Sequence, residues 1–297
     1  METSSFSPSM IIAGCMRWGH WGVRMDPDRL RSMIQDCLAS GIDTFDHADI
    51  YGGPHATESD FGRVLGADPA LRSRMKIITK CGILLPDKPS SAPRIKHYDT
   101  SARYILASAE QSLSSLKTDH IDLFLIHRPD PLMQPDEMAE AFFRLKRDGK
   151  VLHFGVSNFK ASQLRMIYRH WPVEVNQLQV SVEHPHALFD GSVDACMELG
   201  VRVQAWSPLG AGAMDGAAED ERLRKIHAVA EIIAQRHGLE ASQVLLAWVL
   251  THPAKITPVL GTSRIDRMRT AVAVAMQRLD REEWFMLLRA STGRDVA

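Results

Sequence analysis

The chain has 297 residues, of which 45% are hydrophobic and 24% charged, a composition typical of a soluble globular protein with a large apolar core. The 35 basic and 36 acidic residues nearly balance, at a formal net charge of -1, and no basic stripe interrupts the sequence, which argues against a protein that binds nucleic acid. The longest unbroken apolar runs, such as residues 244–250, reach about a third of a membrane span, so no membrane partner is expected.

The cysteines and the first residues bear on the cellular compartment. Four cysteines lie far apart and form no CxxC pair, so we expect reduced thiols; they are Cys15, Cys37, Cys81 and Cys196. The opening Met-Glu-Thr-Ser-Ser has neither the positive segment nor the long apolar segment of a signal peptide. We therefore expect a soluble, cytoplasmic protein.

The chain repeats one pattern: an amphipathic helix, a glycine and a β-rich strand. In the first copy Asp26 is a candidate N-cap and Pro27 a candidate first helical residue. The apolar positions that follow share one helix face; they are Leu30, Met33, Ile34, Cys37 and Leu38. Gly41 is placed to end the helix in the left-handed conformation, and residues 42–45 begin a strand.

Two more copies follow, and further helices are expected near the C-terminus. The helix stripe, glycine and strand are residues 138–145, Gly149 and residues 151–156 in one copy, and residues 193–197, Gly200 and residues 201–206 in the other. Met197 is expected on the buried stripe of its helix. The additional helices are predicted over residues 227–237, 242–250, 265–276 and 282–288.

Eight strands alternate with helical or loop sequence. They are residues 10–15, 42–45, 76–79, 121–126, 151–156, 175–180, 201–206 and 256–260. Such alternation implies parallel strands joined by right-handed crossovers. The simplest closure is an α/β fold, a (β/α)8 TIM barrel with additional C-terminal helices, in a single domain over residues 1–297. A doubly wound open sheet is the alternative, but it favours a GxGxxG fingerprint that residues 14–19 do not supply.

Polar side chains follow the predicted strands at the ends where a barrel enzyme places its reacting groups. Asp46 and Tyr51 come after one strand, Lys80 ends another, and His127 follows a third. Taken singly, each has an ordinary explanation: a turn residue, a rim aromatic, a surface lysine, a hydrogen-bonded core histidine. Together they are the set needed to donate a proton near neutral pH. An ammonium beside a tyrosine favours the phenolate and lowers its pKa, while a carboxylate keeps the ammonium in place.

These residues and motifs resemble the aldo-keto reductase superfamily over nearly the whole chain. Asp46 and Tyr51 in Asp-x-Ala-x-x-Tyr-Gly, Lys80 in Thr-Lys-Cys-Gly and His127 in Leu-Ile-His-Arg-Pro-Asp match its four catalytic residues in order. Within the superfamily, the strings His-Ala-Asp-Ile-Tyr-Gly-Gly and His-Phe-Gly-Val-Ser-Asn-Phe are most similar to the YdhF-type bacterial oxidoreductases. The resemblance implies a (β/α)8 barrel that binds NADPH/NADP+ across its mouth.

The resemblance also implies cofactor-binding residues. Ser157, Asn158 and Gln179 would hold the nicotinamide carboxamide, and Trp206 would stack on the ring. The pyrophosphate would lie along Ser207, Pro208, Leu209 and Gly210. Ser263 and Arg267 would hold the 2'-phosphate with Arg264 as a helper, and Gly261 is a further expected cofactor-binding residue. Because a guanidinium suits phosphate, we expect NADP(H) in preference to NAD(H).

Two departures from the family pattern concern the cofactor and the first motif. Many members hold the phosphate and the adenine amine with Lys-Ser and Glu-Asn, where this chain has Thr262-Ser263 and Thr270-Ala271. The strength of the NADPH preference is therefore open. His47 replaces a common threonine and is assigned no role.

Three other motifs are expected to be structural. His184 and His186 lack an acidic or cysteine partner for zinc, and residues 210–216 lack the βαβ context of a dinucleotide loop. Cys81 lies beside Lys80 but has no second sulfur or base to make it a nucleophile. No metal is expected.

The main functional hypothesis is an NADPH-dependent reductase of aldehydes or ketones, with Tyr51 as general acid. The alternative is an NADP(H)-binding regulatory or redox-sensing subunit on the same fold. A third possibility is an aldolase that uses Lys80 as a Schiff base.

The pocket wall is expected from Trp18, residues 20–21 and two long loops, residues 84–93 and 211–219. Trp18, Trp21 and Leu84 favour an apolar or aromatic carbonyl substrate. The sequence identifies neither the physiological substrate nor the oligomeric state, nor whether the loops close over the site.

Overall fold

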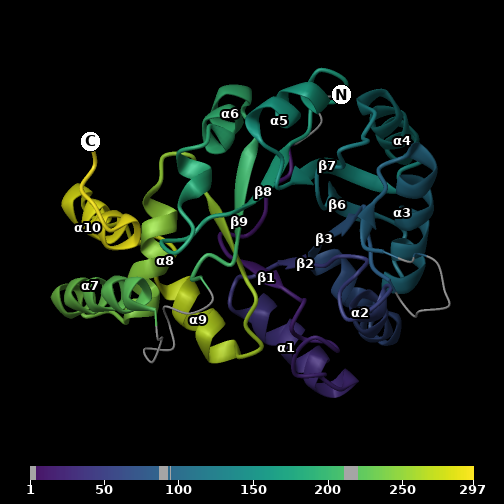
Figure 1. The fold of residues 1–297 in the computed structure, drawn as a ribbon. Coiled ribbons are helices and arrows are strands. Elements are labelled where there is room, and N and C mark those ends of the chain that lie inside the picture. The colour runs from purple at the N-terminus through teal and green to yellow at the C-terminus, as the bar shows by residue number, and fades with distance from the viewer. Residues whose placement is uncertain (1–4, 87–92, 94, 211–219) are drawn as a thin grey trace.

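The computed structural model describes residues 5–86, 93, 95–210 and 220–297, and in them eight parallel strands close into a barrel (Figure 1). The strands are β1 (Ile12–Gly14), β2 (Thr44–Asp46), β3 (Lys76–Cys81), β6 (Ile121–Ile126), β7 (Val151–Ser157), β8 (Val175–Gln179), β9 (Arg202–Trp206) and β10 (Thr257–Leu260). They pair in the order β1-β10-β9-β8-β7-β6-β3-β2, with β2 and β1 closing the ring. The predicted (β/α)8 barrel is confirmed, and the open-sheet alternative is wrong.

A short antiparallel pair, β4 (Ile83–Leu84) and β5 (His97–Tyr98), follows β3 and was not predicted. It brackets the predicted loop over residues 84–93, of which residues 87–92 lie outside the described part of the chain. The second predicted loop, residues 211–219, lies wholly outside it.

Helices surround the barrel (Figure 1). Those that the structure describes are α1 (Pro27–Ala39), α2 (Ala56–Ala67), α3 (Ala102–Leu116), α4 (Pro135–Arg147), α5 (Ala161–Tyr168), α6 (Ser192–Leu199), α7 (Glu221–His237), α8 (Ala241–Thr251), α9 (Ile265–Ala273) and α10 (Arg281–Thr292). Two 3-10 turns span Pro69–Arg74 and His186–Leu188. None of these helices is both long and apolar enough to cross a bilayer.

The first helix shows how local signals set the element bounds. The Asp26 carboxylate accepts a hydrogen bond from the backbone N–H of Arg29, Pro27 is the first helical residue, and Gly41 has a φ of 81°. The buried side chains of α4 are those of the predicted stripe. One stripe assignment is wrong. Met197 is 49% exposed, because the buried face of the short helix α6 is formed by Val193, Ala195 and Cys196.

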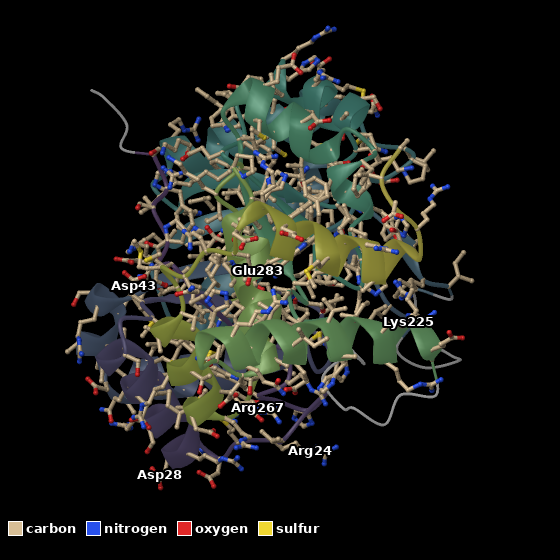
Figure 2. The ribbon with its side chains drawn as sticks, turned by 90° about the vertical axis from the view of Figure 1, so that its left-hand side faces the viewer. Arg24, Asp28, Asp43, Lys225, Arg267 and Glu283 are labelled. Atoms are coloured by element: carbon tan, nitrogen blue, oxygen red, sulfur yellow. The ribbon has the colours of Figure 1, made fainter. Side chains whose placement is uncertain are left out.

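The C-terminal helices pack on one another as well as on the barrel. The indoles of Trp248 on α8 and Trp284 on α10 stack with ring centroids 4.8 Å apart. Each Nε1–H donates to the main-chain carbonyl of the other, at 3.1 Å. His237 at the end of α7 lies 2.7 Å from the buried carboxylate of Glu283, the residue that is labelled in Figure 2.

Apolar side chains fill the barrel interior below the C-terminal ends of the strands. The polar side chains of the barrel lie above them, at its mouth. Seven buried residues form the apolar cluster: Phe6, Ile12, Ile78, Leu123, Leu125, Val175 and Val259. Side chains two residues apart on a strand share a face. Lys80 therefore faces the interior like Ile78, and His127 faces the interior like Leu125. The strand ends above the cluster are where the predicted site residues lie.

Candidate active site

Lys80 is the centre of the polar network in the barrel mouth. Its side chain is fully buried, and its Nζ donates hydrogen bonds to Asp46 Oδ2 at 2.6 Å, to the carbonyl of His47 at 2.7 Å and to the Tyr51 hydroxyl at 3.2 Å. Burial opposes the positive charge, but Asp46 and Tyr51 together raise the pKa of Lys80 above its ordinary value. Lys80 is therefore an ammonium that joins a carboxylate to a phenol.

Tyr51 lies on the turn after β2, and α2 holds that turn in place. The Thr57 hydroxyl donates to the Tyr51 carbonyl at 2.8 Å, and the Thr57 N–H donates to the same oxygen at 3.1 Å. Gly52 and Gly53 have φ values of 77° and 116°, which favour glycine. The chain thus turns directly behind Tyr51.

The pKa of Tyr51 is raised overall, which corrects the expectation of a net lowering by the neighbouring ammonium. Burial is the largest influence and raises the pKa, and the charge of Asp46 adds to that effect. Lys80 lowers the pKa, as expected, but by less. Tyr51 therefore holds its proton in the resting site, while the adjacent ammonium favours the phenolate once that proton has left.

His127 is the fourth predicted residue, and its ring centroid lies 6.0 Å from that of Tyr51. Burial holds the pKa of His127 well below its usual range, and the charges of Lys80, Arg128 and Lys96 lower it further. The imidazole is therefore neutral. Its Nδ1 is buried and has no hydrogen-bond partner among the described residues. The structure brings all four predicted catalytic residues together.

Asp46 is also bound by a residue that the sequence did not single out. Gln177 on β8 donates from its Nε2 to Asp46 Oδ1 at 2.9 Å and to Gln204 Oε1 at 3.0 Å. Both glutamines are buried. Polar residues in the middle of a strand were the available signal, but the prediction used only strand ends.

Three predicted cofactor-binding residues are linked by hydrogen bonds across β7 and β9. The Asn158 Nδ2 donates to Ser157 Oγ at 2.8 Å, and its Oδ1 accepts from Trp206 Nε1 at 3.0 Å. Asn158 has a φ of 62°, which turns the chain at the end of β7. Gln179, the fourth residue of this predicted group, is the last residue of β8 and pairs with Trp206.

The segment after β9 makes a tight turn. Ser207 has a φ of 48° and Gly210 a φ of 71°, and the Gly210 N–H donates to the Ser207 carbonyl at 2.9 Å. The positive φ favours glycine at this position, and a Cβ on Gly210 would lie 2.0 Å from the carboxylate carbon of Glu183 and displace that side chain. Pro208 is buried within the turn, and Leu209 packs against the core.

The predicted phosphate residues lie after β10, at the start of α9. Gly261 is exposed and Ser263 half-buried. Arg264 is engaged by Asp266, through Nε to Oδ1 at 3.1 Å and through Nη2 to Oδ2. Arg267 is exposed on α9 (Figure 2) and forms no ion pair within the described residues. The turn is anchored by Trp18, whose Nε1 donates to the Thr262 carbonyl at 2.9 Å.

Comparisons with known proteins agree with the fold. The model of the Aldo/keto reductase family matches residues 10–290. The chain is 41% identical to the uncharacterized oxidoreductase YcsN of Bacillus subtilis over 290 residues, which cover 97% of this chain and 96% of YcsN. It is 41% identical to the oxidoreductase YdhF of Escherichia coli, over 97% of this chain and 95% of YdhF.

The chain belongs to the aldo/keto reductase family. It is also 40% identical to the 6-dehydroglucose reductase of Agrobacterium fabrum, over 97% of this chain and 96% of that protein. The family and these relatives show an oxidoreductase.

One expected pocket residue of this aldo/keto reductase lies in the core instead. Trp18 is only 2% exposed and packs edge-on against Phe45, at 6.2 Å between ring centroids. The expectation that it lines the substrate pocket is wrong. Trp21, by contrast, is 44% exposed, and its ring lies 6.2 Å from that of Tyr51. Of the two tryptophans between β1 and α1, Trp21 is therefore the one that lies at the barrel mouth.

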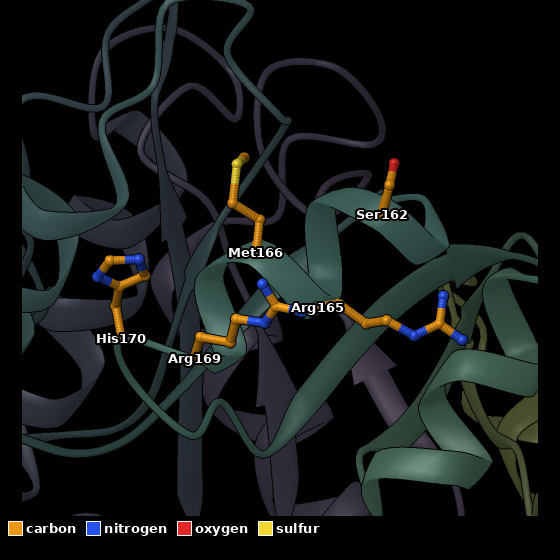
Figure 3. Close-up of a pocket in the computed structure, with 5 residues that line it drawn as sticks. All are labelled: Ser162, Arg165, Met166, Arg169 and His170. Carbon is orange, nitrogen blue, oxygen red and sulfur yellow. The ribbon is translucent and has the colours of Figure 1, made fainter.

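Two cavities of the aldo/keto reductase lie outside the tetrad of Asp46, Tyr51, Lys80 and His127. One, of about 280 Å³, opens beside Asp49 and Tyr104. The other, of about 370 Å³, lies at α5 on the outside of the barrel (Figure 3). Two of its polar side chains already have partners, since Arg165 pairs with Glu198 and His170 Nδ1 lies 2.6 Å from Asp136 Oδ1. Neither cavity is lined by a residue of the tetrad.

The remaining reactive side chains are structural. All four cysteines are free and buried, and burial raises the pKa of Cys81 well above its usual value, which makes a poor nucleophile. Across the described residues, no three of His, Cys, Asp and Glu are grouped so that they could hold a metal ion. His47 is buried edge-on against Phe61, with ring centroids 4.6 Å apart.

Proposed function

We propose that this aldo/keto reductase is an NADPH-dependent enzyme that reduces an aldehyde or ketone to an alcohol, with Tyr51 as the general acid. The observation that carries the proposal is the bonding of Lys80, which contacts Asp46 at 2.6 Å and the Tyr51 hydroxyl at 3.2 Å. A phenol beside an ammonium in a buried site is a proton donor whose conjugate base is stabilised.

Each residue of the tetrad has a separate task in this proposal. NADPH, when bound, supplies the hydride that adds to the carbonyl carbon. Tyr51 donates its proton to the carbonyl oxygen, and Lys80 stabilises the phenolate that remains. Asp46 keeps the ammonium oriented. His127 is neutral, so it can donate one hydrogen bond that orients the carbonyl oxygen without competing with Tyr51 as the acid.

The proposed cofactor site follows the mouth of the barrel from β7 to α9. Ser157, Asn158 and Gln179 would hold the carboxamide, and Trp206 would cover one face of the nicotinamide. The backbone of residues 207–210 would line the pyrophosphate, in a turn where Gly210 leaves no space for a side chain. Gly261, Ser263 and Arg267 would take the 2'-phosphate, at a helix N-terminus that favours anions. The guanidinium of Arg267, which is exposed and forms no ion pair within the described part of the chain, supports NADPH over NADH.

The ion pair of Lys80 disfavours the Schiff-base alternative. A lysine that attacks a carbonyl must first become a neutral amine. Here the Asp46 carboxylate, 2.6 Å away, raises the pKa of Lys80. Deprotonation would leave a buried carboxylate without its cation.

The decisive experiment is the reduction of a panel of aldehydes and ketones by NADPH, followed at the nicotinamide absorbance, in the wild type and in Tyr51→Phe. We expect turnover in the wild type and a loss of about a thousandfold or more in the variant, with NADPH affinity retained. Tyr168→Phe is the matched control, because Tyr168 makes its hydrogen bond to the Leu199 carbonyl outside the site. Full activity in Tyr51→Phe would refute the mechanism. Tight NADPH binding with no turnover of any carbonyl would instead support the regulatory subunit.

A further inference from the structure

Arg128 is a cation in the barrel mouth that the tetrad does not use. It follows His127 directly at the end of β6, and its side chain is half-buried. The guanidinium carbon lies 5.7 Å from the ring centroid of Trp206. Trp206 is itself fixed by its hydrogen bond to Asn158. Arg128 is therefore held between the tetrad and the proposed nicotinamide face.

The charge of Arg128 is not neutralised by the part of the chain that the structure describes. No carboxylate of those residues forms an ion pair with it. Asp130, two positions further on, uses its Oδ1 to accept from the Leu132 N–H at 2.8 Å and its Oδ2 to accept from Thr100 Oγ1 at 3.3 Å. A half-buried guanidinium without a carboxylate is unusual, because desolvation of a charge is unfavourable unless a partner compensates for it.

Two further cations, Lys80 and Lys96, act on His127 together with Arg128. Like Arg128, both lysines disfavour a positive charge on the imidazole and so lower its pKa. Of these three cations, Lys80 alone has a carboxylate within ion-pair distance among the described residues. A substrate that brings a negative charge would be attracted to this space.

We propose that Arg128 binds a carboxylate on the substrate, and that the enzyme prefers short aldehydes or ketones that carry such a group. The inference rests on the proposed reductase function. A guanidinium lying over an indole keeps its N–H edge free, and that edge matches the two oxygens of a carboxylate. This substrate class differs from the apolar or aromatic carbonyl expected from the sequence, an expectation that relied in part on Trp18.

The test compares 4-oxobutanoate with butanal, two aldehydes of equal chain length of which one carries a carboxylate. In the wild type we expect kcat/KM for 4-oxobutanoate to exceed that for butanal by on the order of tenfold or more. Arg128→Met should remove this preference, chiefly through a higher KM for 4-oxobutanoate. Arg169→Met, which removes the same charge from the outer surface near α5 (Figure 3), should keep the preference.

Three results would overturn the inference. The wild type could reduce both aldehydes equally well, which would leave the proposed function intact. Arg128→Met could slow both reactions by the same factor, as expected if Arg128 serves only to support Trp206. The variant could also weaken NADPH binding tenfold, measured by quenching of tryptophan fluorescence, which would assign Arg128 to the cofactor.

A binding measurement separates this inference from the proposed function. Calorimetric titration of the NADP+-bound protein with 4-oxobutanoate requires no turnover. Binding that is lost in Arg128→Met but kept in Arg169→Met would support the anion site even if neither aldehyde were reduced. Binding that Arg128→Met leaves unchanged would overturn the anion site, whatever the activity.

Discussion

Gln177 donates a 2.9 Å hydrogen bond to Asp46 from the opposite side of the barrel. Three strands separate β2 from β8 in either direction around the ring, so the contact crosses the interior above the apolar cluster. Gln177 binds Oδ1 while Lys80 binds Oδ2. Both oxygens of the carboxylate are therefore fixed, and Asp46 cannot rotate away from the ammonium without breaking a buried hydrogen bond.

Gln177→Met should lower kcat for carbonyl reduction by on the order of tenfold, because one buried hydrogen bond to a charged group is lost and Asp46 gains freedom to rotate. Gln111→Met is the matched comparison, since Gln111 is exposed on α3, where its Nε2 donates to Ser115 Oγ at 3.3 Å. It should leave kcat within about threefold. Equal losses of kcat in the two variants would show that the bond to Asp46 is not the cause.

Lys80→Met should abolish reduction and also destabilise the fold. The variant leaves the Asp46 carboxylate buried without its cation, and breaking a buried ion pair on one side typically lowers the free energy of unfolding by about 3–5 kcal/mol. Urea denaturation measures this change. The double variant Lys80→Met with Asp46→Asn should recover most of the stability and none of the activity. A single variant as stable as the wild type would contradict the assigned ion pair.

The tetrad could be predicted because its residues follow apolar strands whose interior-facing positions are set by two-residue alternation. Lys80 comes two residues after Ile78, and His127 two after Leu125, so strand identity alone placed both in the mouth. Their convergence required only that parallel strands close into one barrel. The glycines after Tyr51 likewise follow from local backbone preference.

The remaining features depend on distances that local patterns do not encode. The contact between Gln177 and Asp46 requires the stagger of strands on opposite sides of the ring. The burial of Trp18 depends on how its loop folds back onto Phe45 and Thr262. The pKa of Tyr51 depends on whether burial or the charge of Lys80 has the larger effect, and residue identity does not decide between two opposed influences.

Acid should destabilise the protein partly through His47. Burial lowers the pKa of His47 to about 4, whereas the unfolded chain takes up this proton near pH 6.5. Between those values the unfolded state binds more protons, so the free energy of unfolding falls as the pH drops from about 6.5 to about 4. At about 1.4 kcal/mol per tenfold change in proton concentration, the contribution is about 3 kcal/mol. In His47→Leu, urea unfolding across this range should show a shallower loss.

Asp49 provides a comparison of opposite sign within the same region. Burial, with the charge of Glu58, raises the pKa of Asp49 from its ordinary 3.8 to about 7, so the folded state binds more protons over that range. Its contribution is present at low pH and is lost as the pH rises through about 7. Asp49→Asn should therefore gain stability relative to the wild type at pH 8 but not at pH 4. Parallel changes in the His47 and Asp49 variants would contradict both assignments.

Arg267 and Arg264 should contribute unequally to the selection of NADPH. Arg264 is held by Asp266 through two hydrogen bonds, whereas Arg267 makes no ion pair within the described residues and stands in the first turn of α9. We expect Arg267→Ala to weaken NADPH binding by on the order of tenfold and to leave NADH binding unchanged, because only NADPH carries the 2'-phosphate. Arg264→Ala should change the Kd for NADPH by less than about threefold. Fluorescence titration with both cofactors measures these effects, and an equal loss of NADPH and NADH affinity in Arg267→Ala would place the guanidinium elsewhere on the cofactor.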